Sequence, residues 1–140
     1  NKKSKIMKKR NKKKRVLVDM SASILHHGHI RLIKKAKKYG DVYITLTSDK
    51  EIKKFKNINT ELRFAHRKEI LLSIKYISGV IKSKAIIDNN FFRKHRFDLL
   101  VHGSDNKNLV DKKYVKTLKR TKGISSTKIR KISFKNLKLN

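Results

Sequence analysis

Three of the six histidines in this 140-residue sequence fall within four consecutive positions, in the stretch HHGH. The glycine in this stretch allows close backbone approach, and the amphipathic segment that begins here leaves free N–H groups at a helix N-terminus. Imidazoles beside a helix N-terminus can donate hydrogen bonds to phosphate oxygens. The cluster therefore predicts a phosphate-binding site formed by His26, Gly28 and His29, with His27 packed or facing solvent.

A zinc site is the alternative interpretation of the same histidines. Zinc would need a third protein ligand, and no aspartate or glutamate follows in helical register as it does in metalloprotease motifs. The sequence has no cysteine, which excludes thiolate ligands and disulfides. Phosphate is therefore favoured over metal, and no metal ligand is assigned.

A second polar cluster lies near the end of the sequence, in RTKGISSTKIR. Its glycine makes a turn, the next isoleucine anchors that turn, and three hydroxyl residues stand at the start of a predicted helix. A helix cap needs only one hydroxyl, so a cap alone is the simpler interpretation. Three hydroxyls between two arginines exceed that need and favour a site for the phosphate tail of a nucleotide. The residues are Arg120, Gly123, Ile124, Ser125, Ser126, Thr127 and Arg130.

The elements that must position these clusters follow from the hydrophobic pattern. Strands are expected at residues 15–20, 41–49, 79–83, 97–105 and 114–121. Helices are expected at residues 29–40, 62–77, 89–96 and 125–132, with a polar, lysine-rich connection at 50–61. The alternation predicts an α/β fold, a Rossmann-like parallel sheet of about five strands with helices on both faces.

Ligands of such sheets bind beyond the carboxyl ends of the strands, where the strand order reverses. Four segments follow predicted strands in this sequence: SASILHHGH, TSDKEIKKFK, HGSDNKN and RTKGISST. Every unusual residue of the sequence lies in one of them. The coincidence predicts a single shared site.

Positive charge dominates the composition, with 40 lysines and arginines against 10 acidic residues and a net charge of +30. Residues 1–14 are basic and show no hydrophobic period, which predicts a disordered arm before one domain at 15–135 and a short tail at 136–140. A field this strong attracts polyanions, and the arm would contact them non-specifically. The alternative is a compositional bias toward lysine, asparagine and isoleucine, which an AT-rich genome produces without selection for a polyanion.

The sequence gives no sign of membrane insertion. No apolar run approaches the roughly 20 residues that span a bilayer. The basic N-terminal stretch is not followed by the apolar segment of a signal peptide. We therefore expect a cytoplasmic protein without a membrane span.

Residues 15–132 resemble the cytidylyltransferase family, because HHGH after a first strand, RKEIL in the second helix and RTKGISSTKIR occur in that family's order and spacing. The H-x-G-H pattern alone is shared with adenylyltransferases and class I aminoacyl-tRNA synthetases. The R-T-x-G-I-S-[ST]-T string is far more specific and favours cytidylyl transfer. The resemblance implies a nucleotidyltransferase fold, a homodimer, and transfer of CMP from CTP to a small phosphomonoester similar to glycerol 3-phosphate, with release of pyrophosphate.

The resemblance also implies roles for individual residues. His26 and His29 would hold the triphosphate and stabilise charge on the α-phosphate, with Arg120 as a further catalytic contact to the nucleotide. The other implied nucleotide contacts are Ser21, Gly28, Asp105, Gly123, Ile124, Ser125, Ser126 and Thr127. The implied contacts to the acceptor phosphate are Lys54, Lys56 and Arg67.

The chain departs from the family where G-T-F-D usually precedes the first histidine, because it has Met20, Ser21, Ala22 and Ser23 there. Ser21 keeps a hydroxyl for phosphate, whereas Ser23 replaces a carboxylate that helps to place Mg²⁺. Use of Mg²⁺ with CTP is therefore left open. The tryptophan and lysine expected after Asp105 are also missing, so we expect the core chemistry to be retained and the acceptor pocket to be changed.

Two alternative functions remain at this stage. The first is an adenylyltransferase, or a cytidylyltransferase for phosphocholine, phosphoethanolamine or another sugar phosphate. The second is a non-catalytic basic domain that binds nucleic acid on the same scaffold. Aromatic residues make up only 7% of the sequence and no stacking motif stands out, which disfavours the second.

Overall fold

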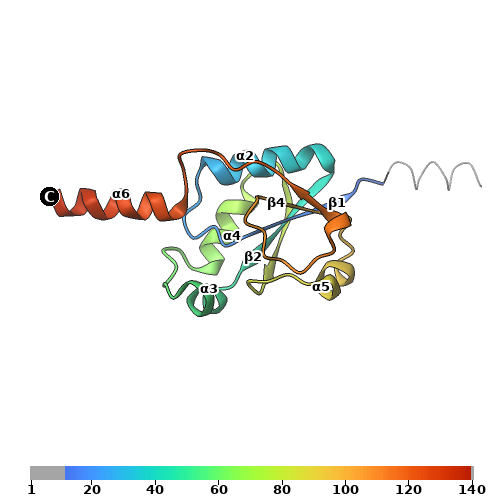
Figure 1. Ribbon diagram of the computed structural model, residues 1–140, viewed down its shortest axis with the longest axis horizontal. Helices are drawn as coiled ribbons and strands as arrows, with labels where there is room; N and C mark the ends of the chain where they lie inside the picture. The colour runs from blue at the N-terminus through green and yellow to red at the C-terminus, as the bar shows by residue number, and fades with distance from the viewer. Residues whose placement is uncertain (1–11, 140) are drawn as a thin grey trace, which may run out of the picture.

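A five-stranded parallel sheet forms the centre of the computed structural model, which describes residues 12–139 (Figure 1). The strands are β1 (Arg15–Met20), β2 (Asp41–Thr47), β3 (Ile77–Ser83), β4 (Leu99–His102) and β5 (Val115–Thr117). Their order in the sheet is β3-β2-β1-β4-β5, and all four neighbouring pairs are parallel. The predicted α/β fold with a five-stranded parallel sheet is confirmed.

Helices cover both faces of this sheet. They are α2 (His27–Ala36), α3 (Asp49–Lys56), α4 (Phe64–Leu72), α5 (Asn89–Lys94) and α6 (Ser126–Leu139), with 3₁₀ turns η1 (Lys37–Tyr39) and η2 (Lys112–Tyr114). Helices α2 and α4 contribute to one hydrophobic cluster and α5 to the other. We call the two sides the α2 face and the α5 face.

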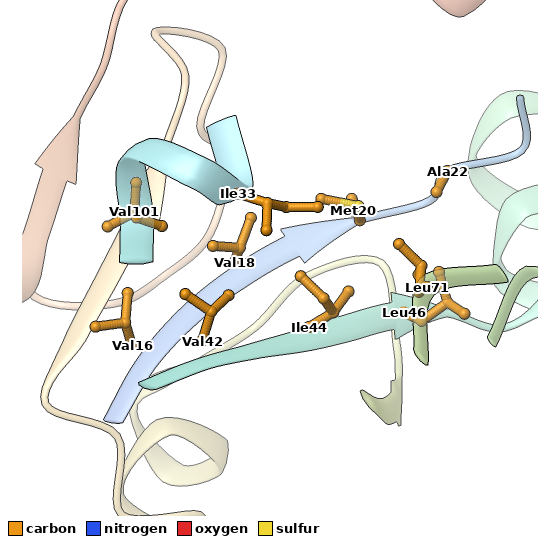
Figure 2. Packing of buried hydrophobic residues seen from close by; sticks show 11 residues of the cluster. Val16, Val18, Met20, Ala22, Ile33, Val42, Ile44, Leu46, Leu71 and Val101 are labelled. Carbon is orange, nitrogen blue, oxygen red and sulfur yellow. The ribbon is translucent and has the colours of Figure 1, made fainter. Parts of the chain in front are cut away.

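Alternation along the strands explains the two clusters, because successive side chains of a strand point to opposite faces. Val16 and Val18 of β1 pack on the α2 face, where Figure 2 shows Ile33 of α2 beside Val18. Leu17 lies between them in sequence and packs on the α5 face against Phe92. All of these side chains are at least nine-tenths buried, so β1 is held from both sides.

The segment 50–61, expected as a connection, is largely helical. Ser48 caps α3 by accepting a hydrogen bond from the backbone N–H of Glu51 at 3.3 Å, and Asn57 ends the helix in the left-handed conformation. Ile52 is the one buried residue of its eight. A single buried position gives no hydrophobic period, which is why the pattern did not indicate this helix.

Among the helices that were expected, α4 and α6 differ most from the expectation in where they end. Helix α4 ends at Leu72, because Ile77 already pairs with Val42 in the sheet. Helix α6 continues to Leu139, so residues 136–139 are helical. Figure 1 shows α6 projecting from the body of the protein. Residues 131–138 of α6 are exposed, so the hydrophobic pattern gave no sign of where this helix ends.

The start of the chain is described only in part. Residues 1–11, most of the expected basic arm, lie outside the described residues. The carbonyl of Lys14 accepts a hydrogen bond from the N–H of Asp41 at 2.8 Å, which ties the residue before β1 to β2. Among the helices of residues 12–139, none combines the length and apolar character needed to cross a lipid bilayer.

Candidate active site

The strand order reverses between β1 and β4. HHGH follows the carboxyl end of β1, and RTKGISST follows the carboxyl end of β5. Helix α2 begins shortly after β1 and carries the histidines. The start of α6 reaches the same place, because the hydroxyl of Ser126 donates a hydrogen bond to the carbonyl of Ile24 at 3.3 Å. The fold therefore unites HHGH and RTKGISST, as expected.

The two outer histidines of HHGH cap helix α2. The N–H of Gly28 donates to Nδ1 of His26 at 3.0 Å, and the N–H of His26 donates to Nδ1 of His29 at 3.1 Å. The ring centroids of His26 and His29 are 3.9 Å apart. Because each Nδ1 accepts a hydrogen bond, the proton of each neutral ring is on Nε2, which remains available to donate. His27 is exposed, in agreement with the sequence prediction.

The surroundings of both rings lower their pKa and so favour the neutral form. Burial, followed by the charges of His26 and Lys56, lowers the pKa of His29 to about 4. Burial, followed by the charges of His27 and Arg120, also lowers the pKa of His26. A neutral ring with its proton on Nε2 is a hydrogen-bond donor without a charge, and it stays a donor across the physiological pH range.

Gly28 is required by the histidine ring beside it. A β-carbon on Gly28 would lie 2.8 Å from Cε1 and 2.9 Å from Nδ1 of His26, and 3.3 Å from Cγ2 of Ile124. The first two contacts are closer than van der Waals separation allows. Crowding of the His26 ring, rather than the approach of a ligand, is thus the constraint that the structure shows.

Lysine and arginine side chains gather at the site. Lys56, at the end of α3, donates a hydrogen bond to the hydroxyl of Ser21 at 3.2 Å. Burial, followed by the charge of Arg130, lowers the pKa of Lys56. Lys54 is on another side of α3, since residues two apart on a helix are separated by roughly 200°. Its ammonium lies 5.5 Å from the centroid of the Phe55 ring. The structure thus brings Lys56, but not Lys54, to the predicted site.

The expected role of Arg67 needs correction, because its guanidinium is turned into the protein and is 1% exposed. Nη1 donates to the carbonyls of Ser21 and Thr47 at 2.6 and 2.8 Å, and Nε donates to the carbonyl of Leu62 at 3.0 Å. Nη2 pairs with Asp49 at 2.5 Å. Arg67 therefore ties the ends of β1 and β2 to α4, in place of the expected contact to an acceptor phosphate.

The three hydroxyls of the second cluster have three different environments. Ser125 caps α6 by accepting from the N–H three residues later at 3.0 Å. Ser126 donates to Ile24, as described above, and Thr127 is exposed. Gly123 has a φ of +80°, a left-handed conformation that favours glycine. Two of the three hydroxyls thus have structural partners. The cap by Ser125 is the simpler interpretation that the sequence offered, whereas the contact of Ser126 with Ile24 was not indicated.

Asp105 lies next to Arg120, the arginine that begins RTKGISST. Its Oδ2 is 3.6 Å from Nη1 of Arg120, and its Oδ1 is 3.7 Å from Nδ1 of His102. A β-carbon on Gly103 would lie 2.9 Å from Oδ1 of Asp105 and 3.2 Å from Cγ of Arg120. Gly103 was not singled out in the sequence, although it directly follows a strand.

Three further residues of this region were missed by the sequence analysis. Asp19, inside β1, accepts hydrogen bonds from Thr45 and Asn108. The sequence could have indicated Asp19, because it is the one acidic residue in the apolar run RVLVDM. Thr45 and Asn108 carry no such signal, since polar residues are common in strands and loops.

The residues present do not form a protein-held metal site. Within residues 12–139, no three His, Cys, Asp or Glu side chains are grouped so that they could hold an ion. Ser23, at the position of the family's aspartate, is 3% exposed, and its hydroxyl has no hydrogen-bond partner in this part of the chain. Ser23 supplies no carboxylate at this position, so the described residues do not fit a protein-held Mg²⁺.

A parallel α/β sheet with imidazole, hydroxyl and cationic donors at its switch point is an arrangement in which α/β proteins bind nucleotides. The family model described as cytidylyltransferase-like matches residues 21–132, and the chain belongs to this cytidylyltransferase-like family. The predicted resemblance, and with it the assignment to the nucleotidyltransferase class of enzymes, is confirmed.

Individual proteins agree with this assignment. The chain is 36% identical over 122 residues to glycerol-3-phosphate cytidylyltransferase of Staphylococcus aureus, a match that covers 84% of this chain and 92% of that protein. It is 35% identical over 128 residues to the Bacillus subtilis enzyme of the same name, covering 84% and 95%. A lipopolysaccharide core biosynthesis protein from Thermoplasma volcanium shares the fold, with a TM-score of 0.67, 17% identity, and coverage of 79% of this chain and 99% of that one.

Proposed function

We propose that this protein transfers CMP from CTP to a small phosphomonoester of the glycerol 3-phosphate type and releases pyrophosphate. The observation that carries the proposal is that Nδ1 of both His26 and His29 accepts a backbone hydrogen bond. This leaves Nε2 of each ring to donate to a phosphate at the switch point of the sheet. Similarity to two glycerol-3-phosphate cytidylyltransferases over most of their length supports CTP as donor and glycerol 3-phosphate as acceptor.

The reaction needs positioning and charge stabilisation more than proton transfer. An oxygen of the acceptor phosphate attacks the α-phosphorus of CTP and forms a new P–O bond. The bond between the α-phosphorus and the bridging oxygen breaks, and its electron pair leaves with pyrophosphate. A phosphomonoester is already ionised at pH 7, so no strong general base is required. This agrees with a site rich in donors and poor in carboxylates.

The side chains of this chain would divide the work as follows. His26 and His29 donate from Nε2 to phosphate oxygens on which charge builds during transfer. Lys56 and Arg120 supply positive charge, and Asp105 holds Arg120 by an ion pair. Lys56 is the remaining candidate for the acceptor phosphate, because Arg67 is occupied within the protein.

The direct test is to measure transfer products with CTP and with ATP across a panel of acceptors. The panel contains glycerol 3-phosphate, phosphocholine, phosphoethanolamine and a sugar phosphate. We expect CDP-glycerol and pyrophosphate from CTP with glycerol 3-phosphate, and tighter binding of CTP than of ATP in calorimetry. Preferred transfer from ATP would instead identify an adenylyltransferase. Binding of RNA without any transfer would identify a nucleic-acid-binding domain.

The homodimer implied by the resemblance and the cytoplasmic location remain predictions. Sedimentation velocity of the full chain would measure the first. Both are independent of the chemistry proposed here, because every residue assigned above comes from one copy of the chain.

A further inference from the structure

A partly buried hydrogen-bond network joins β1 to the loop after β4. Asp19 lies two residues after Leu17 in β1 and therefore faces the α5 side of the sheet. Its Oδ1 accepts a hydrogen bond from Oγ1 of Thr45 at 3.2 Å, and its Oδ2 accepts from Nδ2 of Asn108 at 3.0 Å. Both oxygens of this carboxylate are engaged.

Asn108 is the junction of this network. Its Oδ1 accepts from the N–H of Ile87 at 2.8 Å, and its own N–H donates to Oδ1 of Asn106 at 3.0 Å. The N–H of Leu109 donates to the carbonyl of Ile87 at 2.8 Å. One amide side chain thus connects β1, the segment before α5 and the loop 103–110.

The same loop carries Asp105, whose carboxylate faces Arg120 and His102. The position of Asp105 therefore depends on where the loop is held. Within residues 103–110, Val110 is buried in the α5-face cluster and Asn108 reaches β1, whereas Asp105 is exposed. The hydrogen bond to Asp19 is a polar link between this loop and the strand that leads into the histidine cluster, beside the packing of Val110 in the cluster that contains Leu17.

Asp19 is unsuited to direct contact with a triphosphate. A carboxylate that faced phosphate oxygens would repel them, and both oxygens of Asp19 already accept hydrogen bonds. Burial raises the pKa of Asp19, while the hydrogen bond from Asn108, the charge of His102 and the hydrogen bond from Thr45 act in the opposite direction. The side chain thus functions as a hydrogen-bond acceptor inside the protein.

We propose that Asp19 is a positioning residue that, through Asn108, fixes the loop 103–110 and thereby sets the affinity of the site for the nucleotide. The proposal rests on the proposed function, because it takes Asp105 and Arg120 as part of the nucleotide site. It goes beyond that function by assigning a role to two residues that the proposed chemistry does not use.

The test exchanges the two partners of the hydrogen bond. Asn108→Asp keeps an acceptor for Ile87 but places a carboxylate against the carboxylate of Asp19, which breaks the link. In Asp19→Asn, the new amide oxygen can still accept from Nδ2 of Asn108. The new amide N–H then donates to the hydroxyl of Thr45, which rotates to accept it. The double variant Asp19→Asn/Asn108→Asp restores the bond with donor and acceptor reversed. If the hydrogen bond served stability alone, breaking it would lower the melting temperature without raising KM for CTP relative to KM for the acceptor.

We expect Asn108→Asp to raise KM for CTP at least about tenfold, with kcat and the acceptor KM within about threefold of wild type. The double variant should return KM for CTP to within about threefold of the Asp19→Asn value, since the coupling between contacting residues is then recovered. The proposal would be overturned if Asn108→Asp kept the wild-type KM for CTP, or if the double variant kept the raised KM of Asn108→Asp.

The chain offers a matched control in a second Asn–Asp pair. Nδ2 of Asn89 donates to Oδ1 of Asp111 at 3.1 Å, on the exposed side of the same region. Asn89→Asp introduces the same carboxylate pair away from the site and should leave KM for CTP unchanged. A rise equal to that of Asn108→Asp would show a general effect of charge and would also overturn the proposal.

Amide hydrogen exchange separates this proposal from the proposed function. Exchange at residues 106–110 should quicken in Asn108→Asp and return toward the Asp19→Asn rate in the double variant, even if the protein transfers no CMP. Unchanged exchange in Asn108→Asp would show that Asp19 does not hold the loop.

Discussion

The backbone N–H of His26 donates a hydrogen bond to Nδ1 of His29 at 3.1 Å, so the second histidine of the site helps to cap the helix that carries it. The N–H of Gly28 completes the cap by donating to Nδ1 of His26. Each ring therefore has one nitrogen engaged by the backbone and one nitrogen left for a ligand. The H-x-G-H spacing thus forms a helix cap with the same two side chains that, in the proposed function, donate hydrogen bonds to phosphate.

The first prediction concerns the proton positions of these rings. Because Nδ1 of both His26 and His29 accepts a backbone hydrogen bond, both rings should be Nε2–H tautomers at pH 7. Long-range ¹⁵N–¹H correlation spectra of the free protein distinguish the two tautomers. An Nδ1–H tautomer at either position would contradict the cap geometry.

The second prediction separates the cap from catalysis. His29→Asn keeps an acceptor near the position of Nδ1 but removes Nε2, so the melting temperature should stay close to wild type. Its kcat should fall roughly a hundredfold, or about 3 kcal/mol, by analogy with loss of one oxyanion donor. His27→Ala, at an exposed position, should lose less than about tenfold. Equal damage at His27, or stoichiometric zinc in the purified protein, would contradict the phosphate interpretation.

The third prediction links His29 to acid stability. Its pKa is about 4 in the folded protein against 6.5 in a model compound, so the unfolded state binds more protons between these values. The free energy of unfolding should therefore be highest above pH 6.5 and fall as the pH drops toward 4, by at most about 3 kcal/mol from this group. His29→Asn lacks this contribution and should show a smaller decrease. Urea unfolding of both proteins at pH 7, 5.5 and 4 measures the difference.

The fourth prediction tests the corrected role of Arg67. Arg67→Met should lower the free energy of unfolding by about 3 kcal/mol or more, because buried carbonyl acceptors lose their donor. Arg63→Met, at an exposed position four residues earlier, is the matched control and should change it by less than about 0.5 kcal/mol. If Arg67→Met were as stable as wild type and had a raised acceptor KM, the result would support the phosphate contact predicted from the sequence.

The fifth prediction compares two glycines. Gly28→Ala places a β-carbon against the His26 ring and should reduce kcat at least about tenfold by displacing that donor. Gly123→Ala meets no atom within 4 Å, but its φ of +80° should cost roughly 1 kcal/mol of stability. Turnover and thermal unfolding of the two variants check this contrast. Equal turnover in both would show that Gly28 does not protect the His26 ring.

The strand and helix order was predictable because apolar residues recur at strand and helix spacing wherever an element packs on the sheet. The prediction failed at α3 and at the end of α6, where few side chains are buried. The histidine and RTKGISST clusters were equally visible, since their residue types and spacing do not depend on distant contacts.

The sequence by itself determined a parallel α/β fold, the family and the segments that form the site. Only the tertiary structure decided which donors of these segments remain for a ligand, because their hydrogen-bond partners come from elsewhere in the chain. Arg67 was predicted to bind phosphate, yet carbonyls from three other segments engage it. Asn108 reaches Asp19 across 89 positions, a separation at which no local pattern indicates a contact. Folding brings such partners together through the packing of the sheet, and a one-dimensional pattern does not record it.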